Sequence, residues 1–186
     1  MFIQRSFRRG VALLLGLLLI APWRAGAESK EYQVKAAFLF NFSHFVSWPP
    51  SAFASASTPF RIGVLGDNPF GTALEQTVQG ETIDNRKLEI VPAREAAELK
   101  DCQIIFISKS EAGRVGEILA KLDSRPVLTV SEIDGFGKSG GMIRLYLEGQ
   151  KVRFEINAAV AQQSGLKMSS QLLSLGKIVQ SERPAK

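Results

Sequence analysis

Short apolar runs alternate with stretches of helical periodicity between residues 60 and 130, and this alternation constrains the fold more than any other feature. The runs at 60–66, 103–108 and 127–130 are dense in β-branched and large apolar side chains, which is typical of buried strands. Because helical stretches separate them, the strands are expected to be parallel and covered by helices on both faces. The sequence therefore predicts a single α/β domain with a mostly parallel central sheet.

The segment after residue 29 predicts a long first helix. Its apolar side chains recur at helical spacing, and a proline pair provides the stop. These residues are Val34, Phe38, Phe42 and Phe45, followed by Pro49 and Pro50. At about 100° per residue, Phe40 points away from the side of Phe38, so the helix is apolar on more than one side. We expect part of this helix to contact something other than its own sheet.

Local signals place the remaining elements. Further helices are predicted at residues 68–80, 93–99, 111–122, 157–165 and 170–178, and a further strand at 87–91. Asn68, Asn157 and Ser170 stand where a side chain can cap the free amides of a helix. Two β-rich runs, at 142–147 and 152–156, flank the turn sequence EGQK, which predicts a C-terminal β-hairpin.

Residues 1–27 have the three parts of a secretory signal peptide: a basic start, an apolar stretch at 11–20 and small residues at a cleavage point, 25–27. The apolar stretch is interrupted at Pro22, and its length of about ten residues is half of what spans a bilayer. An acylated anchor would need a cysteine at the cleavage point, whereas the only cysteine is Cys102. We therefore expect an exported protein whose mature domain comprises residues 28–186.

Removal of the predicted signal peptide changes the charge of the protein. Four of the 23 basic residues precede Glu28 and no acidic residue does, which leaves 19 basic and 18 acidic residues and a net charge of +1. Such a surface lacks the basic excess that drives nucleic-acid binding. A single cysteine also excludes an internal disulfide. Because Cys102 adjoins an apolar run, we expect it to pack as a small hydrophobe rather than act as a redox thiol.

The inventory of reactive side chains argues against catalysis. The single histidine, His44, cannot form an HExxH pair or a Cys/His zinc site, and the sequence has no GxSxG nucleophile motif. We therefore expect no enzyme activity, no metal site and no cofactor. A hydrolase that uses Asp67 or Glu132 is kept only as a remote alternative.

One arrangement has the form of a ligand-binding loop. The strand at 60–66 runs through Gly66, Asp67 and Asn68 into a helix start, where free amides can meet an anion. The spacing fits neither GxGxxG nor GxxxxGK(S/T), so a plain strand-to-helix turn is the favoured interpretation. The alternative is a small-ligand or partner-contact loop at the carboxyl edge of the sheet, where Ser108 and Ser131 would join these residues in a ligand site.

Five segments cover almost all of the predicted mature chain: VKAAFLFNFSHFVSWP, FRIGVLGDNPFG, DCQIIFIS, VLTVSEIDGFGKSGGMIRL and VRFEINAAVAQQSGLKMSSQLLSL. In these segments and their order the chain resembles the YfiR-like family of exported bacterial proteins. The resemblance implies a periplasmic regulator that binds the periplasmic part of an inner-membrane diguanylate cyclase, or a similar sensor, and holds it inactive. It also implies sequestration by an outer-membrane lipoprotein, and a link from envelope stress to cyclic-di-GMP and biofilm formation. Redox control through the disulfides of some relatives does not carry over to this chain.

Two surfaces are candidates for binding such a partner. One is the outward side of the first helix, with Phe40 and His44, and this face would also suit a homodimer. The other is the tail segment with Leu166 and Met168 that leads into Leu172. For each surface the alternative is internal packing, because amphipathic stripes usually serve the core. The alternative function is that of a periplasmic small-ligand-binding protein.

Overall fold

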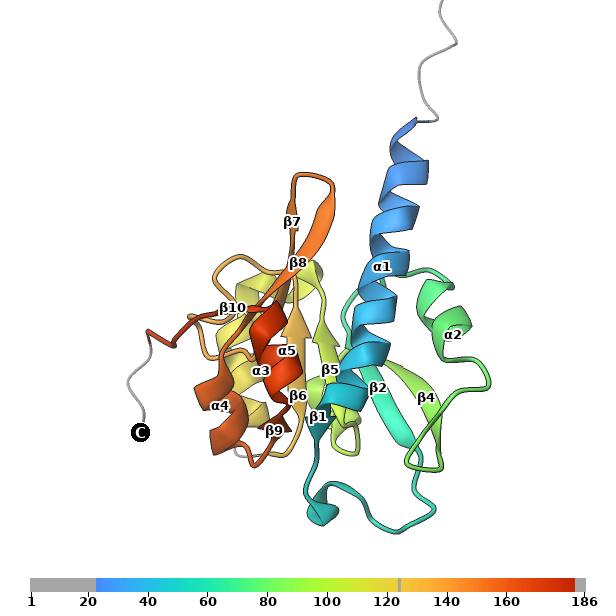
Figure 1. The fold of residues 1–186 in the computed structure, drawn as a ribbon, viewed down its shortest axis with the longest axis vertical. Coiled ribbons are helices and arrows are strands. Elements are labelled where there is room, and N and C mark those ends of the chain that lie inside the picture. Colours follow the sequence, from blue (N-terminus) through green and yellow to red (C-terminus); the bar gives the residue numbers. More distant parts are fainter. Residues whose placement is uncertain (1–22, 124, 183–186) are drawn as a thin grey trace, which may run out of the picture.

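An eight-stranded sheet with the order β10-β8-β7-β6-β5-β2-β4-β3 lies at the centre of the computed structural model, which describes residues 23–123 and 125–182 (Figure 1). Its strands are β2 (Phe60–Leu65), β3 (Thr82–Ile83), β4 (Arg86–Ala93), β5 (Ile104–Ile107), β6 (Leu128–Ser131), β7 (Ile143–Glu148), β8 (Lys151–Ile156) and β10 (Lys177–Ile178). Strands β4, β2, β5, β6 and β7 are parallel to one another. β8 runs antiparallel to β7 and forms the predicted hairpin with it. The expected mostly parallel sheet is confirmed.

Helices cover both faces of this sheet. The α-helices are α1 (Trp23–Phe45), α2 (Ala73–Val78), α3 (Val115–Leu122), α4 (Ala158–Gln163) and α5 (Ser170–Leu175), and the 3₁₀ helices are η1 (Pro50–Ala52), η2 (Ala96–Leu99) and η3 (Lys109–Arg114). Side chains of α1, α2, α4 and α5 share a core with one face of the sheet, while α3 and η2 pack on the other face. In β5, Phe106 belongs to the first core and Ile105 to the second, and both are fully buried. This two-sided burial explains the continuous apolar sequence of the central strands.

Helix α1 runs back across the sheet, from the carboxyl ends of the parallel strands to their amino ends. The Trp48 indole, just after α1, donates a 3.0 Å hydrogen bond to the carbonyl of Gln103 ahead of β5. Near the middle of the helix, Lys35 contacts Glu132, the residue after β6. The first turns of α1 and the tip of the β7–β8 hairpin project beyond the body of the sheet on the same side (Figure 1). The predicted cleavage point at 25–27 falls within α1, and residues 1–22 lie outside the described residues.

The first helix ends earlier than predicted. It stops at Phe45, because Val46 and Ser47 form β1 (Val46–Ser47), which pairs antiparallel with β9 (Lys167–Met168). The Ser169 amide adds a 2.8 Å hydrogen bond to the carbonyl of Phe45. Pairing with a strand more than a hundred residues away therefore ends the helix at Phe45. Pro49 and Pro50 come only after this strand and do not set the end of the helix.

The last predicted helix also needs correction. Ser169, not Ser170, provides the cap, because its hydroxyl accepts a 3.1 Å hydrogen bond from the Leu172 amide. The helix ends at Leu175, and Ile178 lies in β10 rather than on the helix. By contrast, the predicted cap at Asn157 is confirmed, since its side chain accepts a 3.2 Å hydrogen bond from the Val160 amide.

Three other predicted helices begin later or are wound more tightly than expected. The segment at 93–99 is reduced to η2, and the segment at 111–122 starts as η3 before α3 begins. The helix expected from residue 68 begins only at Ala73, although Asn68 accepts a 2.9 Å hydrogen bond from the Phe70 amide and so caps the turn that precedes it. Strand β3 was not predicted; Asp84 and Asn85, both with positive φ, connect it to β4 in a tight turn.

Candidate functional site

A buried ion pair ties α1 to the carboxyl edge of the sheet. The Lys35 ammonium contacts the Glu132 carboxylate, and these side chains are only 2% and 3% exposed. Glu31, one turn before Lys35 on α1, contacts the same ammonium. The Tyr32 hydroxyl donates a 3.0 Å hydrogen bond to the second oxygen of Glu132. Two carboxylates therefore surround a lysine that would otherwise be costly to bury, and its ammonium lies 4.6 Å from the centre of the Tyr32 ring.

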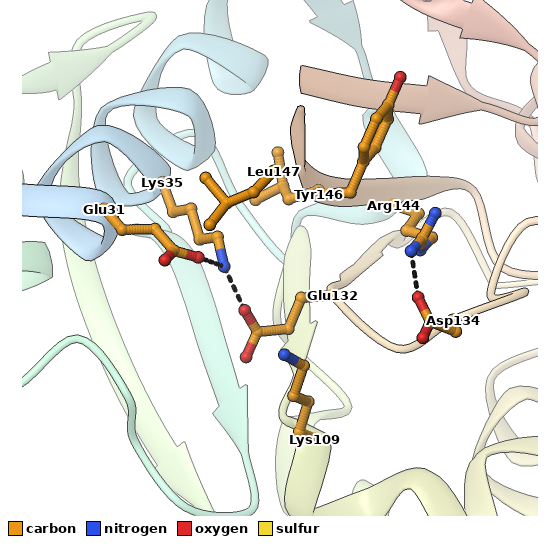
Figure 2. A pocket seen from close by; sticks show the side chains of 9 residues that line it. Glu31, Lys35, Lys109, Glu132, Asp134, Arg144, Tyr146 and Leu147 are labelled. Carbon is orange, nitrogen blue, oxygen red and sulfur yellow. Dashed lines mark hydrogen bonds and ion pairs between the residues drawn. The ribbon is translucent and has the colours of Figure 1, made fainter. Parts of the chain in front are cut away.

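This ion pair forms part of the lining of an open cleft of about 260 Å³ between α1 and β7 (Figure 2). The cleft is lined by Glu31, Lys35, Lys109, Glu132, Asp134, Arg144, Leu145, Tyr146 and Leu147. The acidic and basic side chains come from four places in the chain: α1, the start of η3, the loop after β6 and strand β7. Three acidic and three basic side chains line the cleft, so their formal charges sum to zero.

Arg144 closes the cleft beside β7. Its guanidinium contacts the Asp134 carboxylate and lies 3.5 Å from one carboxylate oxygen of Glu155, while the Lys177 ammonium lies 3.2 Å from the other. The guanidinium carbon lies 5.2 Å from the centre of the Tyr146 ring. Its Nε atom is buried without a hydrogen-bond partner among the described residues. The Arg144 side chain is thus held by charge on its terminal nitrogens and packed along its stem.

Lys109 differs from the other basic groups that line the cleft. Its side chain is exposed, and within residues 23–123 and 125–182 it forms no ion pair with a carboxylate. Figure 2 shows its ammonium directed toward the cleft, near Glu132 but without an interaction drawn between them. The cleft therefore contains two compensated cations, Lys35 and Arg144, and one that is available to a ligand or partner.

The model of the YfiR/HmsC-like family matches residues 32–177 of the chain. The chain belongs to the YfiR/HmsC-like family. This is a family of periplasmic regulators of diguanylate cyclase signalling, and its role is regulatory rather than catalytic. The match begins at Tyr32 and includes Lys35, Glu132 and Arg144, so the whole cleft except Glu31 lies within the family domain. A search of curated proteins gives no significant match.

Two solved structures resemble this YfiR/HmsC-like protein in fold. A conserved domain protein from Vibrio cholerae O1 biovar El Tor strain N16961 has a TM-score of 0.55 at 10% identity, covering 79% of this chain and 59% of that one. The ABC domain from Streptococcus pneumonia, in complex with L-Trp, has a TM-score of 0.52 at 11% identity, covering 80% and 60%. The chain thus spans about three-fifths of the length of these structures. At such low identity the likeness shows the fold alone.

The five residues predicted to bind a small ligand do not line the cleft. Gly66, Asp67 and Asn68 follow β2, which is separated from β7 by β5 and β6. Ser108 directly follows β5, and Ser131 is the last residue of β6. The Ser131 hydroxyl is fully buried; it donates a 2.6 Å hydrogen bond to the carbonyl of Ile107 and accepts one of 3.1 Å from the Ile133 amide. Ser108 is also buried and caps η3. Both hydroxyls therefore have structural partners.

The edge of the sheet after Gly66 is filled by side chains of η3. A Cβ atom on Gly66 would lie 2.4 Å from Ser110 Oγ and 2.6 Å from a carboxylate oxygen of Glu111. The Ser110 hydroxyl accepts a 3.0 Å hydrogen bond from the Asp67 amide, and Arg94 pairs with the Asp67 carboxylate at 2.6 Å. A filled edge counts against a small-ligand site at this position in this family member.

The residues predicted to bind a partner fall into two groups. Phe40 is half-buried and His44 is exposed, and their rings meet edge to face on α1 with centroids 4.9 Å apart. Leu166 and Leu172 are each only 2% exposed and belong to the core under α1, as the internal-packing alternative had it. Met168 is half-buried and is held in β9. A role of these five residues in partner binding stays a prediction, and the two leucines have little surface to offer.

Sequence reasoning missed Lys35, Glu31 and Arg144 as site residues. The lysine lies within an apolar helical stretch with Glu31 four positions before it, which is also the ordinary pattern of a solvated surface pair. Nothing local indicated that the lysine points inward. A charged residue close to Ala36 and Leu39, which are fully buried, was the only available signal, and it became informative once the fold placed Glu132 opposite.

Two searches of the described part of the chain gave no candidates. No group of three or more histidine, cysteine, aspartate or glutamate side chains there is arranged to hold a metal ion. Nor does any helix there have the length and apolar character needed to span a membrane.

Cys102 is buried in the core that contains α3, as expected, and burial raises the pKa of its thiol to about 11.

Proposed function

We propose that this chain represses an inner-membrane diguanylate cyclase, or a similar membrane sensor, by binding its periplasmic part, and that it catalyses no reaction itself. The family match over residues 32–177 carries the proposal, because the family regulates diguanylate cyclase signalling. The geometry supports regulation by contact. Within the described residues, the cleft neutralises Lys35 and Arg144 with neighbouring carboxylates, while α1 and the β7–β8 hairpin project beyond the sheet.

The decisive experiment measures cyclic-di-GMP in cells. Deletion of the gene is expected to raise the cyclic-di-GMP level several-fold and to increase surface attachment, and expression of the full chain from a plasmid is expected to reverse both effects. Deletion of the cyclase gene in the same strain should abolish the effect of losing the repressor. An unchanged cyclic-di-GMP level in the deletion strain, under envelope stress as well as without it, would rule out the cyclase version of the proposal.

Export by a cleaved signal peptide at residues 1–27 is part of the proposal. Replacing Leu15 and Leu18 with arginine places two charges in the predicted apolar stretch and should block export. This double variant is expected to accumulate unprocessed in the cytoplasm and to fail to complement the deletion strain. The exported chain, analysed by mass spectrometry, should begin at Glu28. Full complementation by the double variant would show that the protein acts inside the cell.

Two further partners belong to the same proposal. We expect an outer-membrane lipoprotein to sequester the chain, and co-precipitation from solubilised outer membranes under envelope stress tests this.

A homodimer through the outward side of α1 is tested by light scattering on the purified protein, with Phe40→Asp expected to produce monomers. A monomer of the unaltered chain at micromolar concentration would remove the dimer from the proposal without affecting repression.

A further inference from the structure

Strand β7 extends further than its neighbour β6. The two strands pair only through Val130 with Ile143 and Ser131 with Arg144. Beyond Ser131 the chain turns away from the sheet, because the Ser131 hydroxyl accepts the 3.1 Å hydrogen bond from the Ile133 amide. β7 continues to Glu148, where it is paired with β8 alone. From Leu145 to Glu148, the side of β7 that faces away from β8 therefore has no neighbouring strand in the described structure.

The hairpin register shows which backbone groups face this open side. Glu148 and Lys151 flank a two-residue turn and so form the hydrogen-bonded pair that closes the hairpin. Hydrogen-bonded and non-bonded pairs alternate along an antiparallel ladder, so Leu147 and Val152 form a non-bonded pair. The N–H and C=O of Leu147 consequently point away from β8. The 2.8 Å bond from the Asn157 amide to the Met142 carbonyl fits the same alternation at the other end of the hairpin.

The open side of β7 faces the cleft. The cleft has a volume of about 260 Å³, and its lining includes Leu145, Tyr146 and Leu147 of β7, Lys35 on α1 and Lys109 after β5. Outside the β7–β8 ladder, the described residues form no hydrogen bond to the backbone of Leu147, and its side chain is 48% exposed. Unpaired amide and carbonyl groups along a strand edge are a template for an additional strand. The lysine without a carboxylate partner, Lys109, adds a positive charge at the same place.

We propose that the open edge of β7 binds an extended segment of the partner as an added β-strand, and that an acidic side chain of this segment pairs with Lys109. This inference rests on the proposed function, because it identifies how the periplasmic part of the cyclase is held. Main-chain hydrogen bonds to Leu147 supply the strand geometry. The charge of Lys109 selects a carboxylate, since the other cations that line the cleft, Lys35 and Arg144, already have carboxylate partners.

Amide hydrogen exchange tests the added strand without any substitution. The probe is the purified periplasmic domain of the cyclase whose activity the chain represses, added to the isotopically labelled protein and followed by NMR. Exchange of the Leu147 amide is expected to slow at least tenfold in the complex, because an outward-facing N–H gains an acceptor. The Val152 amide faces the opposite edge of the hairpin and should be unchanged. If the Leu147 amide exchanges as fast in the saturated complex as in the free protein, the proposal is wrong.

A proline scan gives a matched test of affinity. Leu147→Pro removes the N–H that faces the cleft and leaves the hydrogen bonds between β7 and β8 in place. Val152→Pro removes the corresponding outward N–H on β8, whose neighbour β10 reaches only Glu155 and Ile156. We expect Leu147→Pro to weaken binding of the cyclase domain at least tenfold and Val152→Pro less than threefold. Equal weakening by both variants overturns the proposal.

Charge reversal tests the carboxylate. Lys109→Glu is expected to weaken binding at least tenfold, whereas Lys100→Glu, an exposed lysine ahead of β5, should have no effect. If the wild type binds the cyclase domain, and Lys109→Glu and Leu147→Pro bind it with the same affinity, this inference is wrong and the proposed function stands. Absence of any binding by the wild type defeats both. Concentration-dependent protection of Leu147 in the protein alone would assign the edge to a second copy instead.

Discussion

Lys35 and Glu132 form an ion pair across 97 residues of sequence, and both side chains are almost completely buried. The lysine belongs to a helix that packs over the sheet, and the glutamate follows a central strand. Their contact fixes the position of α1 at the edge from which β7 projects. Because the pair lies in the wall of the cleft, its integrity sets the geometry of the proposed partner site.

Removing one member of this pair should be costly. Lys35→Met keeps the apolar stem but leaves the buried carboxylate of Glu132 without its counter-charge. We expect the free energy of unfolding to fall by about 3–5 kcal/mol, measured by urea denaturation. The double variant Lys35→Met, Glu132→Leu should recover most of that loss, since no isolated buried charge remains.

A surface pair provides the control for this prediction. Lys121 and Glu117 lie 2.7 Å apart on α3, and both side chains are more than half exposed. Lys121→Met should change the free energy of unfolding by less than about 1 kcal/mol, because water screens the pair. If the two lysine variants were equally stable, Lys35 would be a solvated residue and not the anchor of α1.

Gly66 is required by the backbone and by its neighbours. It has a φ of +91°, and a side chain there would meet Ser110 and Glu111. Gly66→Ala should lower the free energy of unfolding by about 1–2 kcal/mol, because alanine is strained in the left-handed conformation. A clash of the new Cβ with Ser110 or Glu111 would add to this loss. Gly113→Ala is the control, since Gly113 has no close neighbour and no positive φ. A neutral Gly66→Ala would show that the loop can rearrange.

The fold was predictable because its strongest determinants are local. The buried strands β2, β5 and β6 are apolar throughout, and the helical periodicity of α3 is carried by side chains that the structure buries. A four-residue turn sequence was enough to place the β7–β8 hairpin. Errors occurred where a distant segment decided the local conformation, as at Val46, which pairs with Met168 instead of continuing the helix.

The site was less predictable because it is formed by residues that are far apart in sequence. Sequence reasoning placed polar groups at the carboxyl edge, and that edge exists, but Ser108 and Ser131 use their hydroxyls to support the loops they begin. The cleft lies one strand further along, where a lysine from α1 meets a glutamate after β6. The burial of charged side chains depends on tertiary packing, and no periodicity in a single sequence reveals it.

Ser169 and Ser170 are adjacent, but only Ser169 caps the last helix, α5. Ser169→Ala removes the acceptor for the Leu172 amide and should cost about 1 kcal/mol of unfolding free energy. Ser170→Ala replaces an exposed residue in the first turn and should be neutral or slightly stabilising, because alanine is the better helix former. Thermal denaturation of the two variants under identical conditions checks the difference. The reverse order would restore Ser170 as the cap.

The buried thiol makes stability depend on pH in the alkaline range. Burial raises the pKa of Cys102 from 9.0 to about 11, so above pH 9 the unfolded chain loses the thiol proton while the folded protein keeps it. The contribution of Cys102 is therefore complete below pH 9 and is lost progressively as the pH rises toward 11, by at most about 2–3 kcal/mol.

Cys102→Ala isolates this contribution from the lysines and tyrosines that titrate in the same range. The difference in unfolding free energy between the wild type and Cys102→Ala should be constant from pH 7 to 9 and then shrink by about 2 kcal/mol by pH 11. Iodoacetamide should leave the thiol of the folded protein unmodified at pH 8 and label it readily in urea, because only the unfolded chain exposes a thiol of ordinary pKa. A difference that stays flat to pH 11, or rapid labelling of the folded protein, would place Cys102 in contact with solvent.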